Sequence, residues 1–230
     1  MKKKFFISFL LLAVGLFLAF LPKVGLNVTE NRTEENAVIA EQIQSETLQA
    51  SIKLDSEFDY DSILEIDPTQ TLLNYEQADK NLIIGRLLIP SIDLNLSVYN
   101  GVSNPILNSG LGTMKPNLEM GKGNFPIVGH YSSDKEILFG VLYDINMGDL
   151  IYLTDNKNIY EYKVYDTKVV NPDEIEWIED SVAEKHGKPI ISLMNCYYVD
   201  GENTGKRYFV FAEFINMYEY SQEDINIINK

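Results

Sequence analysis

Several residue types are scarce in this chain of 230 residues, and each scarcity narrows what the protein can be. There is one cysteine, Cys196, so no disulfide can form within the chain. Acidic residues far outnumber basic ones, and the formal net charge of −15 argues against a nucleic-acid binder, which presents a basic face to the phosphates. Hydrophobic residues still make up 45% of the sequence, so the chain can build a core and is not globally disordered.

The N-terminus carries a targeting signal. Three lysines at positions 2–4 precede an apolar run at 5–21, which spans roughly 26 Å as a helix at ~1.5 Å per residue. The lysines favour a cytoplasmic N-terminus, with the rest of the chain outside. A cleaved signal peptide is the alternative, but its apolar part is usually shorter and no small-x-small site follows Leu21. We expect a cytoplasmic tail at 1–4 and a retained single-pass signal-anchor at 5–21.

The next segment differs sharply in composition. Residues 22–80 hold thirteen acidic and four basic side chains, and their sparse apolar residues follow no sustained period. This composition predicts a solvated stalk or linker, with a frayed helix at 37–54 as its one regular element. The polar residues 218–230 are expected to form a dispensable tail, which leaves 81–217 as the folded domain.

The domain at 81–217 is rich in short β-type runs and poor in helical ones. A hairpin is expected between 149–154 and 159–170, because turn residues at 155–157 separate them. One short helix is expected within 103–111 and a helical turn within 172–180. The remaining strands are expected at 82–89, 94–99, 124–130, 189–195 and 207–214. This pattern predicts an all-β barrel or sandwich.

The lone cysteine follows the apolar run 190–195, and a residue at a strand exit can be held rigidly at a cleft rim. A free thiol outside the cell is a liability, so Cys196 is either an inert core residue or a reactive group. Because a thiol has a pKa near ~8.5, a nucleophilic role requires a base or an electropositive site beside it.

Two histidines are available as that base. His186 lies in the polar stretch 184–188 and is expected to be a solvated bystander. His130 ends the apolar run 125–129 and leaves a strand as Cys196 does, so the two can meet across a groove. Taken alone, His130 would more readily be interpreted as a structural histidine.

Arginine is rare beside lysine, with three residues against sixteen: Arg32, Arg86 and Arg207. Arg207 opens the last strand only eleven residues after Cys196. Strands joined by so short a connection are expected to be neighbours, so Arg207 can return to the thiol. A planar guanidinium suits an oxyanion better than a mobile ammonium does. The alternative is a strand-end charge that faces water.

In their chain order, several segments between 81 and 215 resemble the class A sortases. Ser-Leu-Met-Asn-Cys at 192–196 is similar to the Thr-Leu-x-Thr-Cys signature of that family, and Arg207 falls where the family has its catalytic arginine. The segments that match the region around the catalytic histidine are 110–115, 121–125, 129–130, 138–142 and 151–155. The resemblance implies a sortase-type closed β-barrel with short helices, preceded by the N-terminal transmembrane helix.

The chain departs from the family at both threonines of the signature, which are Ser192 and Asn195 here. The family uses the residue before the cysteine to bind substrate, so Asn195 and Ser192 are the expected substrate-binding residues. Because Asn195 replaces the threonine before the cysteine, the family's usual peptide specificity is not expected to carry over unchanged. The chain also has no C-terminal apolar segment like that of pilus-building relatives, which favours a class A-like housekeeping role.

Some family members bind calcium through acidic residues ahead of the catalytic histidine. Here Lys115, Leu118 and Lys122 fall at about those positions, and Glu119 is the one acid nearby. We therefore expect no metal site, and the resemblance implies no cofactor.

The resemblance implies a membrane-bound cysteine transpeptidase of a Gram-positive-type bacterium, with Cys196, His130 and Arg207 as its catalytic residues. Its substrates would be secreted proteins that carry a Leu-Pro-x-Thr-Gly-like sorting signal, cleaved through a thioacyl intermediate and joined to an amine of a cell-wall precursor. Two alternatives remain open. A Cys-His peptidase would release the same intermediate to water, and an inactive anchored binding module would keep only the fold.

Overall fold

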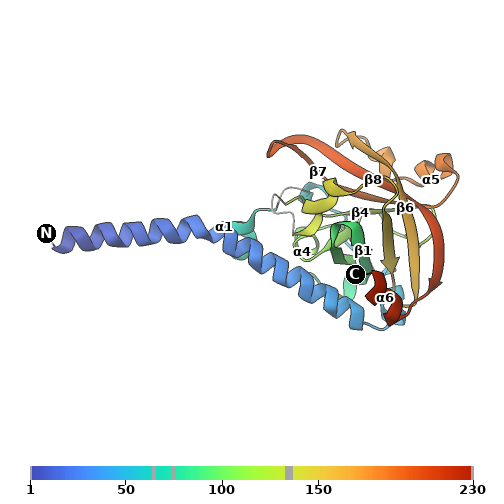
Figure 1. Cartoon of the computed structure of the whole chain (residues 1–230), viewed down its shortest axis with the longest axis horizontal. Helices are drawn as coiled ribbons and strands as arrows, with labels where there is room; N and C mark the ends of the chain where they lie inside the picture. The colour runs from blue at the N-terminus through green and yellow to red at the C-terminus, as the bar shows by residue number, and fades with distance from the viewer. Residues whose placement is uncertain (1, 64–65, 74–75, 133–136, 229–230) are drawn as a thin grey trace.

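Eight strands close into a barrel in the order β1-β2-β3-β4-β7-β8-β6-β5, and a long helix runs from the N-terminus onto one side of it (Figure 1). The computed structural model describes residues 2–63, 66–73, 76–132 and 137–228. The strands are β1 (Ile83–Ile89), β2 (Leu94–Tyr99), β3 (Leu111–Thr113), β4 (Asn124–Val128), β5 (Leu150–Thr154), β6 (Asn158–Val170), β7 (Ile190–Val199) and β8 (Glu202–Glu219).

Helices are more extensive than the predicted all-β class allows. The first alone, α1, has 41 residues. The α-helices are α1 (Lys2–Gln42), α2 (Ser45–Ser51), α3 (Pro68–Leu73), α4 (Asn104–Leu107), α5 (Asp180–His186) and α6 (Gln222–Ile228). The 3-10 helices are η1 (Tyr60–Ser62), η2 (Lys80–Leu82), η3 (Pro90–Ile92), η4 (Leu138–Asp144) and η5 (Ile175–Ile178). The closed barrel is confirmed, and it carries a substantial helical periphery.

The predicted strands lie close to the observed ones. The hairpin between β5 and β6 is confirmed, with Thr154 paired to Ile159 across the turn. The main difference is at the end of the domain, where β7 continues through Cys196 to Val199 and β8 begins at Glu202. Asp200 and Gly201 form the turn, both with positive φ (51° and 82°), as a tight hairpin connection requires.

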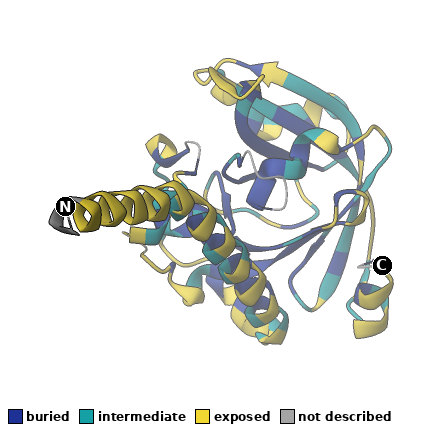
Figure 2. Cartoon of the chain, turned by 60° about the vertical axis from the view of Figure 1, so that its left-hand side comes forward, coloured by how far each residue is buried: buried dark blue, intermediate teal, exposed yellow. Residues whose placement is uncertain are grey.

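The predicted solvated stalk at 22–80 is folded against the barrel. Figure 2 shows the first turns of α1 after the grey start as exposed and its later turns as partly buried, and residues 5–20 are all exposed. Ala37 and Ala40 are buried there, and the Asn36 amide donates to the Ser109 carbonyl oxygen at 3.0 Å. Small side chains let a helix approach closely, so a segment with few large apolar residues still docks. Beyond α1, Leu48 and Ile63 are also buried.

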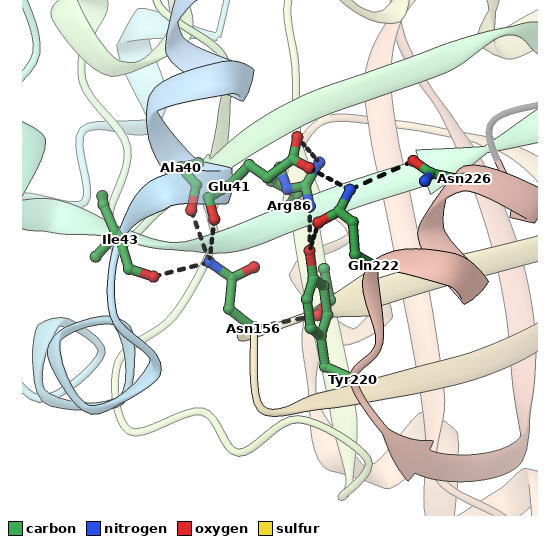
Figure 3. A network of polar contacts seen from close by, with 9 residues as sticks. Ala40, Glu41, Ile43, Arg86, Asn156, Tyr220, Gln222 and Asn226 are labelled. Atoms are coloured by element: carbon green, nitrogen blue, oxygen red, sulfur yellow. Dashed lines mark hydrogen bonds and ion pairs between the residues drawn. The ribbon is translucent and has the colours of Figure 1, made fainter.

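Polar contacts fasten the end of α1 to the barrel (Figure 3). The Asn156 amide, from the β5–β6 turn, donates to the carbonyl oxygens of Ala40 at 2.8 Å and Ile43 at 2.9 Å. The last carbonyls of a helix lack i+4 partners, and Ala40 has a long 3.4 Å bond from the Ile43 N–H, so the Asn156 amide helps to cap the C-terminus of α1. From β1, the fully buried Arg86 guanidinium lies 3.2 Å from the Glu41 carboxylate.

The residues expected to be a dispensable tail also join the fold. Strand β8 runs to Glu219, and α6 buries Ile225 and Ile228 in a cluster with Leu88 and Ile159. Ile225 and Ile228 are three residues apart, so they lie on one face of α6 and supply this contact.

Candidate active site

Strands β4 and β7 lie side by side and parallel, and this pairing brings His130 to Cys196. The register pairs Val128 with Met194, and the Gly129 N–H donates to the Met194 carbonyl oxygen at 3.1 Å. Two residues beyond this pair come His130, just past the end of β4, and Cys196, within β7. In a parallel pair equal offsets stay adjacent, so the two side chains occupy the same end of the sheet.

The antiparallel pairing of β7 with β8 adds the arginine. Cys196 and Arg207 are direct cross-strand partners. Side chains at paired positions share a face of the sheet. Arg207 is half-buried, which fits the predicted return to the thiol better than it fits a strand-end charge that faces water.

The backbone of the N-terminal segment covers this group of residues. The Ile63 carbonyl oxygen accepts from the Cys196 thiol at 3.4 Å and from an Arg207 Nη2 at 3.4 Å. The Ile63 side chain is packed in the same buried cluster as Cys196 and Met194. Only 1% of Cys196 and 3% of His130 is exposed, so the site is closed in this structure.

Glycine is required beside the histidine. A Cβ on Gly129 would lie 2.6 Å from Leu111 Cδ2 and 2.8 Å from Phe139 Cδ2. The chain leading to His130 therefore approaches the core too closely for any other residue, and this approach fixes where the imidazole leaves β4.

The two predicted substrate-binding residues are fully buried and bonded within the protein. The Ser192 hydroxyl donates to Asn124 Oδ1 at 2.7 Å, which ties β7 to β4. The Asn195 amide donates to the Phe139 carbonyl oxygen at 2.9 Å, which ties β7 to η4. Neither side chain is open to a peptide in this structure. Both therefore have an observed role in holding the strands that carry the site.

The other candidates lie away from the site. His186 ends α5, and its Nε2 is 2.9 Å from a Glu213 carboxylate oxygen, so it is paired rather than fully solvated. Glu213 pairs with Ile190, at the opposite end of β7 from Cys196. Arg86 is engaged with α1.

Tyrosines surround the three residues, and none of them was predicted to matter. Tyr131, Tyr197 and Tyr208 each follow a candidate catalytic residue in the sequence. All three pack against a fourth, Tyr143 of η4. The repeated tyrosine after each candidate was a usable sequence signal, whereas the place of Tyr143 depends on folding.

The lysines ahead of His130 are paired with acids, Lys122 with Glu119 and Lys115 with Asp180 at the start of α5. The Lys115 Nζ lies 2.8 Å from an Asp180 carboxylate oxygen. Among the described residues there is no group of three or more His, Cys, Asp or Glu side chains that could hold a metal ion.

Comparison with known proteins adds evidence independent of this geometry. The Sortase domain family model matches residues 87–215. Sortase A of Bacillus anthracis is 38% identical over 180 residues, covering 76% of this chain and 82% of that protein. Sortase A of Listeria monocytogenes is 32% identical over 190 residues, covering 83% and 82%. Its solved structure superposes with a TM-score of 0.58 at 33% identity, covering 64% of this chain and 97% of that one.

Proposed function

Because the chain belongs to the sortase family of cysteine transpeptidases, we propose that it cleaves a Leu-Pro-x-Thr-Gly-like sorting signal and transfers the cleaved protein to a cell-wall amine. The observation that carries the proposal is the pairing of Cys196 with Arg207, with one carbonyl oxygen held by both. A substrate carbonyl at that position meets a nucleophile and an oxyanion donor together.

In the first half of the reaction, the Cys196 thiolate attacks the threonine carbonyl carbon. Arg207 stabilises the oxyanion that develops, and His130 protonates the departing glycine amine as the C–N bond breaks. The product is a thioester between Cys196 and the threonine. The Ile63 carbonyl oxygen must leave first, because it occupies the donors that the substrate needs.

In the second half, an amine attacks the thioester. His130 removes a proton from the incoming amine, and the Cys196 thiolate leaves as the new amide bond forms. The covalent intermediate thus splits one difficult exchange into two easier steps. Neither step calls for a metal or a redox cofactor.

The N-terminal helix indicates where in the cell the enzyme acts. Among the described residues, Phe5–Gln42 is the one helix long and apolar enough to cross a membrane, and its apolar part is not covered by the protein. The lysines at 2–4 place its start in the cytoplasm by the positive-inside rule, so the barrel lies outside. There it meets secreted proteins and the amine of a cell-wall precursor.

Product analysis tests the proposal. The protein is incubated with a Leu-Pro-x-Thr-Gly peptide, with and without a glycine-based or diaminopimelate-type amine, and the products are separated by mass. We expect the amine adduct to dominate when the amine is present. Equal yields of the free threonine acid in both samples would favour the hydrolytic peptidase. No product of either kind, together with an unlabelled thiol, would favour a binding module.

A further inference from the structure

The 3-10 helix η4 is bonded to the strands of both the base and the nucleophile. At its start, the Phe139 N–H donates to the His130 carbonyl oxygen at 3.2 Å. The Phe139 carbonyl oxygen accepts from the Asn195 amide, one residue before Cys196. One short element therefore sets β7 and the end of β4 relative to each other.

The far end of η4 reaches the nucleophile through Tyr143. The pairing of β7 with β8 shifts register between Cys196 and Tyr198, which interrupts the ladder beside the thiol. The Tyr143 hydroxyl fills the interruption: it donates to the Cys196 carbonyl oxygen at 2.5 Å and accepts from the Tyr198 N–H at 3.0 Å. A bulge leaves backbone groups unpaired, and buried backbone groups need partners. Here a side chain from another element supplies both.

The Tyr143 ring is itself held by its neighbours. It stacks on Tyr131 with ring centroids 5.6 Å apart, and its edge meets Tyr208 at 4.9 Å and Tyr197 at 5.9 Å. These neighbours adjoin His130, Arg207 and Cys196 in the sequence. A ring fixed on three sides gives its hydroxyl one position.

We propose that Tyr143 is a positioning residue, whose hydroxyl fixes the backbone of Cys196 in the β7 bulge and so aims the thiol at the substrate carbonyl beside Arg207. This inference rests on the proposed transpeptidase function. The geometry gives the reason. The thiol hangs from the residue whose carbonyl Tyr143 holds, and a nucleophile misplaced by about 1 Å can react about a hundredfold more slowly.

Burial supports this role of the hydroxyl. It raises the pKa of Tyr143 well above the ordinary value of a tyrosine, so the group keeps its proton and remains a donor across the working pH range. The residue touches the backbone of Cys196 and does not exchange protons with the substrate.

The test compares Tyr143→Phe with a matched control, Tyr162→Phe. Tyr162 also bonds a backbone group, accepting from the Gly121 N–H at 3.0 Å, but it lies in the barrel core away from the site. Steady-state transpeptidation of one sorting peptide is measured per active thiol, counted by alkylation. Because Cys196 is the sole cysteine, that count is specific to this thiol, and thermal melts show whether each variant is folded.

We expect kcat of Tyr143→Phe to fall about ten- to a hundredfold with KM within about threefold, and Tyr162→Phe to stay within about twofold of wild type. Alkylation by iodoacetamide should stay within about twofold in both variants, since a small reagent needs no aimed thiol. If Tyr143→Phe matches Tyr162→Phe in kcat, the positioning role is wrong.

Hydrogen exchange of the Tyr198 amide provides a second readout that does not depend on catalysis. Loss of the Tyr143 acceptor should speed its exchange at least tenfold in Tyr143→Phe and leave it unchanged in Tyr162→Phe. Unchanged exchange in both would overturn the inference even if kcat fell. A wild-type protein without transpeptidase activity would refute the proposed function, whereas faster exchange would still support the contact itself.

Discussion

Cys196 on β7 faces Arg207 on β8 as its direct cross-strand partner, and both donate to the carbonyl oxygen of Ile63. The hairpin that joins the strands turns at Asp200 and Gly201, so the connection is short and the register is fixed. The pairing of β7 with β8 therefore sets the position of Cys196 relative to Arg207. It does not depend on a long loop.

Arg207→Ala should lower kcat/KM by about a hundred- to a thousandfold, as loss of one oxyanion donor does. Arg207→Lys keeps the charge but loses the planar fork, so it should recover only part of the activity. The fall should appear in kcat if the contact strengthens in the transition state, and in KM if Arg207 only holds peptide. Steady-state kinetics measure kcat and KM of each variant, and thermal melts show whether the variant is folded. A wild-type value of kcat/KM in Arg207→Ala would mean that Arg207 is a surface residue with no part in catalysis.

Loosening the segment that covers the thiol should raise activity. Ile63→Ala removes a buried side chain that holds the segment over Cys196, so the substrate displaces the Ile63 carbonyl more easily. We expect kcat/KM to rise about three- to tenfold, mainly through KM. Leu48→Ala is the control, since it removes a buried side chain of the same N-terminal segment within a different cluster. It should lower the melting temperature without raising kcat/KM. A fall in kcat/KM of Ile63→Ala would mean that the segment assists binding.

The stability of the fold should depend on pH through Asp180. Hydrogen bonds from Lys115 and from the Asn124 N–H, at the start of β4, lower the pKa of this carboxyl below its ordinary value. A lowered pKa in the folded state stabilises the fold above the unfolded pKa of ~3.9, and this contribution is lost as the pH falls through the folded value.

Urea unfolding of wild type and Asp180→Asn should therefore differ most above about pH 5, and the difference should shrink as the pH falls through the lowered folded-state pKa of Asp180. Asp173→Asn, which changes an exposed aspartate nearby, should follow wild type at every pH. A gap between wild type and Asp180→Asn that does not change with pH would show that the carboxylate charge is not the cause.

Calcium should not activate the enzyme. Lys122 and Lys115, both ahead of the histidine, pair with Glu119 and with Asp180 of α5, so a cation would have to displace an ion pair at each acid. Activity of a chelated sample should change less than twofold on adding millimolar calcium. A tenfold or greater increase in activity with calcium, but not with magnesium as the control, would show that a calcium site exists despite these ion pairs.

Sequence patterns predicted the elements that depend on local signals and missed those that depend on packing. The turn at 155–157 predicted the β5–β6 hairpin. Cys196 and Arg207 were expected at strand ends, but they lie within β7 and β8, and only His130 lies just past the end of its strand. The Asp-Gly pair at 200–201 is also a local hairpin signal, and it is consistent with a strand that continues past Asn195 to Val199.

The docking of 22–80 could not be predicted in the same way. Ala37 and Ala40 look unremarkable in an acidic sequence, and their burial depends on a barrel surface that forms from residues far along the chain. The contacts of Ile63 and Tyr143 at the thiol are also long-range: they join residues 133 and 53 positions away from Cys196. No periodicity in either segment reports such a contact.

The central claim is that Cys196 carries the substrate as a thioester, and intact-protein mass spectrometry tests it directly. The protein is mixed with a sorting peptide in the absence of an amine, quenched in acid and weighed. We predict a mass increase equal to the peptide up to its threonine, mapped to Cys196, lost on adding an amine and absent in Cys196→Ala. An unmodified wild-type protein that still cleaves the peptide, or a Cys196→Ala variant with appreciable turnover, would contradict the account.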